Sequence, residues 1–146
     1  EKLAAGIERA ADALAPAIAE LAEQGPTLGK PIVTGFSQGG MLAFCLAVPH
    51  GELFSAPFPL GGWLPPPLWP KSAPAGDAPP SAPPSAPPII AFHGDEDRAV
   101  KFEPTEEAVY RVQLNSYVGV GHAISPDMRE DLFDGLRDAL SQIVEH

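Results

Sequence analysis

The fold is decided by residues 31–48, which read PIVTGFSQGGMLAFCLAV. The first six are a short β-branched run bounded by proline and glycine, a pattern that predicts a buried strand at 31–36. Residues 38–48 are apolar almost throughout, so they predict a buried helix that ends before Pro49. A strand that passes through a glycine-rich turn into a helix is typical of an α/β domain with a parallel sheet.

An amphipathic helix is predicted on the N-terminal side of this strand. Its apolar residues are three and four positions apart, which places them on one helical face. We expect Pro16 to kink or restart this helix, because proline removes a backbone donor, and Gly25-Pro26 to end it. The predicted stripe consists of Leu3, Ile7, Ala10, Leu14, Ile18 and Leu21.

Three more strands are predicted towards the C-terminus, at 54–62, 89–93 and 112–118. The first has the weakest pattern, because Pro57 and Pro59 cannot donate hydrogen bonds to a sheet. The second and third are followed directly by polar residues and glycines. Both therefore end in loops that bring polar side chains to one edge of a parallel sheet.

Two more helices are predicted, a short one at 104–110 and an amphipathic one that begins at Ser125 and Pro126. Serine is a favoured capping residue, and proline suits the first helical position. Strands alternating with helices indicate that residues 1–146 form a single α/β domain. The stripe of the last helix consists of Met128, Leu132, Phe133, Leu136, Leu140 and Ile143.

The composition excludes several classes of protein. Nine basic residues against 19 acidic ones give a net charge of −10, which argues against a nucleic-acid groove and against a polybasic membrane surface. No apolar run approaches the ~20 residues that span a bilayer. The single cysteine, Cys45, cannot form an internal disulfide, and we expect it to be a small buried hydrophobe in a cytoplasmic protein.

Residues 65–88 hold eleven of the 19 prolines, including the run APPSAPPSAPP. Such a low-complexity segment favours polyproline II or disorder. We interpret it as a stiff loop that replaces a crossover helix, since the connection between parallel strands needs a dozen or more residues. A docking site for a proline-reading domain is the alternative.

The pattern G-x-S-x-G at 35–39 lies between the predicted strand and helix, which makes Ser37 a candidate nucleophile. Flanking glycines allow the sharp turn that exposes such a serine. The helix that follows offers its N-terminal dipole and the backbone N–H of Gln38 to a developing oxyanion. The alternative is a glycine-rich turn with an idle serine.

A nucleophilic serine needs a base, which an acidic residue must orient. His122 follows the strand at 112–118 and fits the base. Asp95, Glu96 and Asp97 follow the strand at 89–93, and spacing alone does not choose among them. Three neighbouring acids could also bind calcium or magnesium, but consecutive carboxylates rarely wrap one ion, so we expect no metal.

Three motifs occur in order along the chain, namely G-F-S-Q-G-G at 35–40, H-G-D-E-D-R-A-V at 93–100 and G-V-G-H at 119–122. Together they resemble the phospholipase/carboxylesterase family, small α/β-hydrolases that include acyl-protein thioesterases. The resemblance runs from about residue 1 to the C-terminus. It implies an α/β-hydrolase-like fold, of which this chain would form the C-terminal part of a mainly parallel sheet flanked by helices.

The resemblance also assigns roles to residues. The family pattern H-G-x-x-D-x-x-V implies that Asp97 is the acid of a triad with Ser37 and His122. The segment G-W-L-P at 62–65 resembles one that lines the acyl pocket, which implies substrate contacts for Trp63 and Leu64. The implied activity is that of a serine carboxylesterase or thioesterase that needs no cofactor and acts on small acyl esters or thioesters. A catalytically impaired remnant that only binds a partner is the alternative.

Family members carry several strands before the helix that opens this chain, with a loop that supplies a second oxyanion N–H. The resemblance therefore implies that strand 32–36 is the edge of a half sheet here. An apolar edge strand invites pairing with another chain. We expect either a homo-oligomer or a complementing N-terminal segment.

Overall fold

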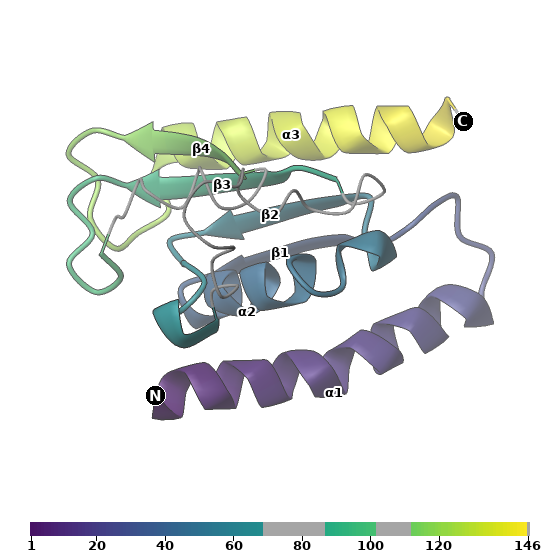
Figure 1. Ribbon diagram of the computed structural model, residues 1–146. Coiled ribbons are helices and arrows are strands. Elements are labelled where there is room, and N and C mark those ends of the chain that lie inside the picture. Colours follow the sequence, from purple (N-terminus) through teal and green to yellow (C-terminus); the bar gives the residue numbers. More distant parts are fainter. Residues whose placement is uncertain (69–86, 102–111, 146) are drawn as a thin grey trace, which may run out of the picture.

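The computed structural model describes residues 1–68, 87–101 and 112–145 (Figure 1). Four parallel strands form one sheet in the order β1-β2-β3-β4. The strands are β1 (Ile32–Phe36), β2 (Ala56–Leu60), β3 (Ile89–Gly94) and β4 (Val112–Tyr117), and the α-helices among the described residues are α1 (Lys2–Gln24), α2 (Gln38–Ala47) and α3 (Pro126–Val144). Short 3-10 helices lie at Gly51–Leu53 and Pro66–Leu68.

Helices cover both faces of the sheet, with α1 and α2 on one side and α3 on the other (Figure 1). On the α2 side Phe44 and Leu64 pack in a buried cluster with residues of α1 and β3. On the α3 side Phe58, Phe92 and Met128 form a second cluster. This three-layer arrangement confirms the predicted α/β architecture, and β1 and α2 form the predicted strand–turn–helix.

Helix α1 rules out one of the two effects expected of Pro16 and corrects the predicted buried face. It runs without a break through Pro16, so this proline does not restart it. The missing donor is tolerated because Pro16 lies on the exposed side of the helix. Of the predicted stripe, Ile7 is buried, whereas Leu3, Leu14 and Leu21 are 49%, 39% and 67% exposed. The buried face consists of Ala4, Ile7, Ala11 and Ala15.

Helix α3 begins as predicted, with the Ser125 side chain accepting a hydrogen bond from the Met128 amide at 3.2 Å. Met128 is fully buried, and Leu132 and Leu136 pack beside it against the sheet. Phe133 and Leu140, which the predicted stripe included, are 49% and 54% exposed. The face of α3 that packs on the sheet is narrower than the predicted apolar stripe. Phe133 and Leu140 therefore lie beside this face and remain exposed.

Strand β2 forms despite Pro57 and Pro59. All five of its residues are buried, and it lies between β1 and β3. Proline normally avoids such a position because it cannot donate to the ladder. Burial of the whole strand between two helical layers outweighs the two missing donors.

The remaining expectations concern two segments that lie wholly or partly outside the described residues, the cysteine and the absence of a membrane span. The predicted helix at 104–110 lies outside the described residues, as do residues 69–86 of the proline-rich loop predicted at 65–88. Cys45 is buried as predicted, and burial, together with the negative charges of Glu8 and Asp12, raises the pKa of its thiol to about 11. None of the helices in the described ranges is long and apolar enough to cross a membrane.

Candidate functional site

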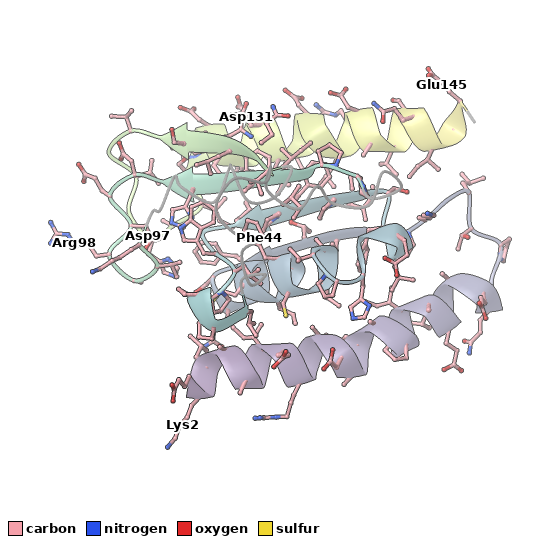
Figure 2. All side chains as sticks on the ribbon, in the orientation of Figure 1. Lys2, Phe44, Asp97, Arg98, Asp131 and Glu145 are labelled. Atoms are coloured by element: carbon pink, nitrogen blue, oxygen red, sulfur yellow. The ribbon has the colours of Figure 1, made fainter. Side chains whose placement is uncertain are left out.

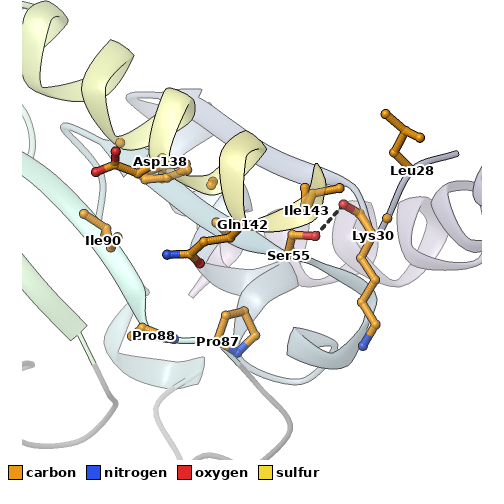
Figure 3. Close-up of a pocket in the computed structure, with 14 residues that line it drawn as sticks. Leu28, Lys30, Ser55, Pro87, Pro88, Ile90, Asp138, Gln142 and Ile143 are labelled. Atoms are coloured by element: carbon orange, nitrogen blue, oxygen red, sulfur yellow. Dashed lines mark hydrogen bonds between the residues drawn. The ribbon is translucent and has the colours of Figure 1, made fainter. Parts of the chain in front are cut away.

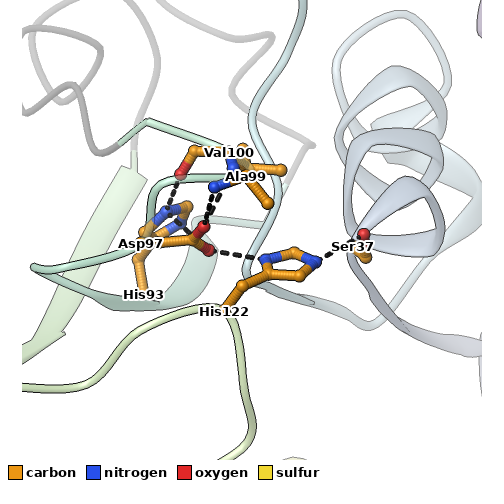
Figure 4. A network of polar contacts seen from close by, with 6 residues as sticks. All are labelled: Ser37, His93, Asp97, Ala99, Val100 and His122. Atoms are coloured by element: carbon orange, nitrogen blue, oxygen red, sulfur yellow. Dashed lines mark hydrogen bonds and ion pairs between the residues drawn. The ribbon is translucent and has the colours of Figure 1, made fainter.

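The loops that follow β1, β3 and β4 meet at the carboxyl ends of these strands (Figure 4). Figure 2 shows Asp97 at this end of the molecule, while its neighbour Arg98 points away into solvent. Ser37, Asp97 and His122 come from the three different loops and form one continuous set of polar contacts. Parallel strands commonly gather functional side chains at this edge.

Ser37 occupies a strained turn between β1 and α2. Its φ of 58° is the only positive value at a described residue other than glycine. Two backbone hydrogen bonds of 3.0 Å hold the turn, from Ser37 N to Leu60 O and from Met41 N to Ser37 O. A side chain on Gly35 would overlap the backbone of Gly39, so this position requires glycine. Strain of this kind persists only where the surrounding structure enforces it.

His122 joins the serine to the carboxylate. Its Nε2 lies 2.9 Å from Ser37 Oγ, and its Nδ1 lies 2.7 Å from Asp97 Oδ2. The ring also stacks on Phe36, with centroids 4.9 Å apart and planes at 28°. Two hydrogen bonds and a stacked ring therefore restrain the orientation of the imidazole.

Asp97 is buried, with 6% of its surface exposed. Its Oδ1 accepts hydrogen bonds of 2.9 Å from the amides of Ala99 and Val100. Burial alone would raise the pKa of this carboxyl group, but the hydrogen bond and charge of His122 and the two backbone amides outweigh it and lower the pKa. The carboxylate is therefore ionised and can only accept.

The ionised Asp97 fixes the hydrogen positions on His122. Since Asp97 Oδ2 can only accept, Nδ1 of His122 carries the hydrogen and donates it. In the neutral ring Nε2 is then the acceptor, and the Ser37 hydroxyl donates to it. This arrangement can remove a proton from Ser37.

The two neighbouring acids have other surroundings. Asp95 is exposed, and its Oδ1 accepts a hydrogen bond of 2.8 Å from the amide of Gly119. Glu96 is exposed as well. Of the three acids that spacing left open, Asp97 is the one in contact with His122. Within the described ranges no three His, Cys, Asp or Glu side chains are grouped to hold a metal ion.

Gly94 lets the two loops approach each other. A side chain at Gly94 would overlap the carbonyl oxygen of Val120 and meet that of Gly121 at 2.7 Å. The amide of Glu96 donates to Val120 O at 3.0 Å across the same contact. The loop that carries Asp97 thus packs directly against the loop that carries His122.

Gln38 is the first residue of α2, directly after Ser37. The first amides of a helix have no intrahelical acceptor, and they lie at the positive end of its dipole. The backbone N–H of Gln38 is therefore available to an oxygen bound beside Ser37. Its predicted role at an oxyanion remains a prediction.

Trp63 and Leu64 lie in the core, with 6% and 1% of their surfaces exposed. The Trp63 ring stacks on His93 at 5.4 Å and 20°, and it packs at a tilt against Phe44 at 5.7 Å. Trp63 thus contacts the strand that leads into the loop of Asp97. The substrate contacts that the resemblance implies for Trp63 and Leu64 remain a prediction.

One groove lies away from these contacts, and another reaches the residues that follow Ser37. A groove of about 680 Å³ opens at the amino ends of the strands, between the sheet and the last turns of α3, with Lys30, Ser55, Pro88, Gln142 and Ile143 among its lining residues (Figure 3). A smaller groove of about 380 Å³ lies between α1 and the start of α2, where it reaches Gln38 and Gly39. Sequence reasoning found neither groove, because each is formed by elements far apart in the chain.

Comparisons with known proteins show what the whole chain is similar to. A family model described as Phospholipase/Carboxylesterase matches residues 1–139. SOBER1 of Arabidopsis thaliana is 23% identical with a TM-score of 0.71, over 92% of this chain and 64% of that protein. Esterase PE8 is 25% identical with a TM-score of 0.68, over 94% of this chain and 63% of that protein. Acyl-protein thioesterase 2 of Zea mays is 23% identical with a TM-score of 0.67, over 94% of this chain and 66% of that protein.

The structural matches place the sheet and its helices within the α/β-hydrolase fold. The chain spans 64% of the length of SOBER1, so it covers part of this fold. A comparison with curated proteins finds no match.

Proposed function

Because this chain belongs to the phospholipase/carboxylesterase family, we propose that it is a serine hydrolase that cleaves acyl esters or thioesters. Ser37 is the nucleophile, His122 the base and Asp97 the orienting acid. The observation that carries the proposal is the unbroken pair of contacts from Asp97 Oδ2 to His122 Nδ1 at 2.7 Å and from His122 Nε2 to Ser37 Oγ at 2.9 Å.

The first half of the reaction acylates the serine. Ser37 Oγ attacks the acyl carbon and gives its proton to His122 Nε2, while the carbonyl electron pair moves onto oxygen. The Gln38 amide donates to this oxyanion, and the ionised Asp97 stabilises the imidazolium through Nδ1. When the tetrahedral intermediate collapses, His122 returns the proton to the departing alcohol or thiol.

The second half releases the acid. A water molecule gives a proton to His122 Nε2 as its oxygen attacks the acyl-enzyme. Collapse of the second tetrahedral intermediate breaks the bond to Ser37 Oγ, which takes back the proton. The reaction consumes one ester or thioester and one water and regenerates the enzyme. Trp63 and Leu64 are the proposed substrate contacts.

The proposal also includes a partner for the open side of β1. β1 ends the sheet within the described residues, so one of its sides has no strand beside it there. We propose that a second copy of the chain or a complementing segment pairs with this edge.

Labelling of the serine tests the proposal directly. A fluorophosphonate probe should label the wild-type protein and fail to label Ser37→Ala. Ser141→Ala is the matched control, because Ser141 is an exposed serine on α3 that donates to Arg137 O. Equal labelling of wild type and Ser37→Ala would contradict the assignment of the nucleophile.

Measurement of ester hydrolysis distinguishes an active hydrolase from a catalytically impaired binding module. Short-chain p-nitrophenyl esters should be hydrolysed by the wild type, and His122→Ala should abolish the reaction. A folded protein that binds these esters without hydrolysing them would instead be the catalytically impaired binding module.

A further inference from the structure

A second histidine, His93, lies beside Asp97 in the same network (Figure 4). It is 1% exposed, and the reaction proposed above does not use it. Its Nε2 lies 2.9 Å from the carbonyl oxygen of Val100 and 3.6 Å from Asp97 Oδ2. The side chain thus meets both the triad acid and the turn that carries it.

The surroundings of His93 fix the state of this nitrogen. A carbonyl oxygen and an ionised carboxylate can only accept hydrogen bonds, so Nε2 carries a hydrogen and donates it to Val100 O. The distance of 3.6 Å to Asp97 Oδ2 is too long for a second hydrogen bond. The ring is stacked on Trp63 at 5.4 Å, which restrains its plane. His93 therefore acts on Asp97 through Val100.

Val100 connects the two side chains. Its amide donates to Asp97 Oδ1 at 2.9 Å, and its carbonyl accepts from His93 Nε2 at 2.9 Å. Both polar backbone groups of Val100 are thus bonded to the network. Since His93 belongs to the rigid strand β3, its hydrogen bond ties the turn at 97–100 to the sheet.

We propose that His93 is a positioning residue for Asp97. By donating to Val100 O it closes the turn whose amides hold Asp97 Oδ1, and this leaves Oδ2 directed at His122 Nδ1. The inference rests on the proposed function for its kinetic consequence, but the positioning itself is a property of the free protein. Without the donor, the turn opens and the carboxylate leaves His122.

Three variants test the role. His93→Gln places an amide donor near the position of Nε2, whereas His93→Met fills similar space and has no donor. Phe92→Leu is the matched control, because Phe92 is the adjacent, 2% exposed residue of β3 and packs in the cluster on the opposite face of the sheet. Phe92→Leu therefore shows the effect of disturbing the core while the turn at 97–100 keeps its contacts.

The first readout is the proton NMR signal of His122 Nδ1–H, which a short hydrogen bond to a carboxylate moves far downfield. We expect this signal in the wild type, in His93→Gln and in Phe92→Leu, and we expect it to disappear in His93→Met. The second readout is the hydrolysis of p-nitrophenyl esters. A misplacement of about 1 Å lowers kcat ~10²-fold in His93→Met with KM unchanged, because His93 touches no substrate.

The results separate this proposal from the proposed function. A signal and a kcat in His93→Met equal to those of the wild type would overturn the positioning role, as would an equal loss in Phe92→Leu. If the wild type hydrolyses no ester, the proposed function fails while the NMR signal still decides the positioning. If His93→Met does not fold, ¹⁵N NMR of the wild type decides instead, since a His93 Nε2 without hydrogen contradicts the proposal.

Discussion

At the scale of single residues, the buried carboxylate of Asp97 links the site to stability. Its pKa lies below the ordinary value because His122 and two backbone amides outweigh the cost of burial. A group with a lowered folded-state pKa stabilises the fold above the unfolded-state pKa and loses this contribution as pH falls through the folded-state value. The contribution of Asp97 is therefore complete near neutral pH.

We expect Asp97→Asn to be less stable than the wild type at pH 7, with a difference that shrinks below about pH 4, where an unfolded aspartate is protonated. Urea unfolding of both proteins between pH 7 and pH 3 measures this difference. The same variant should lose activity by about 10⁴-fold, as expected when a triad acid no longer sets the imidazole tautomer. A stability difference that grows on acidification would contradict the ionised state of Asp97.

Gly94 gives a second prediction at this scale. Gly94→Ala should lower the free energy of unfolding by ~1–3 kcal/mol or more, because the new methyl group overlaps Val120 O where the two loops touch. It should also lower activity by separating Asp97 from His122. Gly6→Ala is the control, since the methyl group that it adds meets nothing within 4 Å apart from its chain neighbours and the backbone of its own helix. Equal stability of the two variants would contradict this prediction, because it would show that the loop of His122 can move to make room for the methyl group.

Single residues also show how far a sequence can identify a site. Ser37 and His122 were predicted because their motifs follow strands that the pattern of apolar residues defines. Spacing left Asp95, Glu96 and Asp97 open, and the resemblance supplied the choice, since all three follow the same strand. The contacts of His93 and Phe36 were missed, because stacking and a hydrogen bond to a carbonyl depend on how distant segments pack.

At the scale of elements, the strand and helix around Ser37 were predictable because turn chemistry, propensity and burial favour the same structure there. Helix α1 was predicted as a helix, but its buried face was displaced. Leucines outrank alanines in hydrophobicity, whereas the close packing of α1 on α2 uses small residues. The pattern of apolar residues therefore predicts that a segment is helical more reliably than it predicts which face of the helix is buried.

Helix α1 offers a test of this face. Ala11→Leu should destabilise the protein by ~1–3 kcal/mol, because Ala11 is 1% exposed and a larger side chain overpacks the contact with α2. Leu14→Ala should change stability by less than ~0.5 kcal/mol, because Leu14 lies on the outer side at 39% exposure. Urea unfolding of both variants shows which substitution lowers the free energy of unfolding more. The reverse order would place the leucine stripe against α2 after all.

At the scale of the whole molecule, β1 is both the strand that leads into Ser37 and one end of the sheet within the described residues. Just beyond the two ends of β1, Ser37 N donates to Leu60 O and Pro31 O accepts from Ser55 N. In a parallel pair the backbone groups of alternate residues of β1 therefore face β2. The remaining N–H and C=O groups face the open edge. The exposed leucines of α1, Leu3, Leu14 and Leu21, add apolar surface on the neighbouring layer.

We expect this chain to associate through β1 at micromolar concentration, because unpaired backbone groups on an apolar edge strand are satisfied by pairing with another strand. Sedimentation should show a species larger than 15.3 kDa. Thr34→Lys should shift it towards the monomer, because Thr34 is an exposed residue of β1 and a lysine on an edge strand opposes pairing. The matched control is Ser116→Lys on β4, which places the same charge on an exposed position at the other end of the sheet. A single wild-type species of 15.3 kDa with cooperative unfolding and full esterase activity would show that the edge of β1 needs no partner.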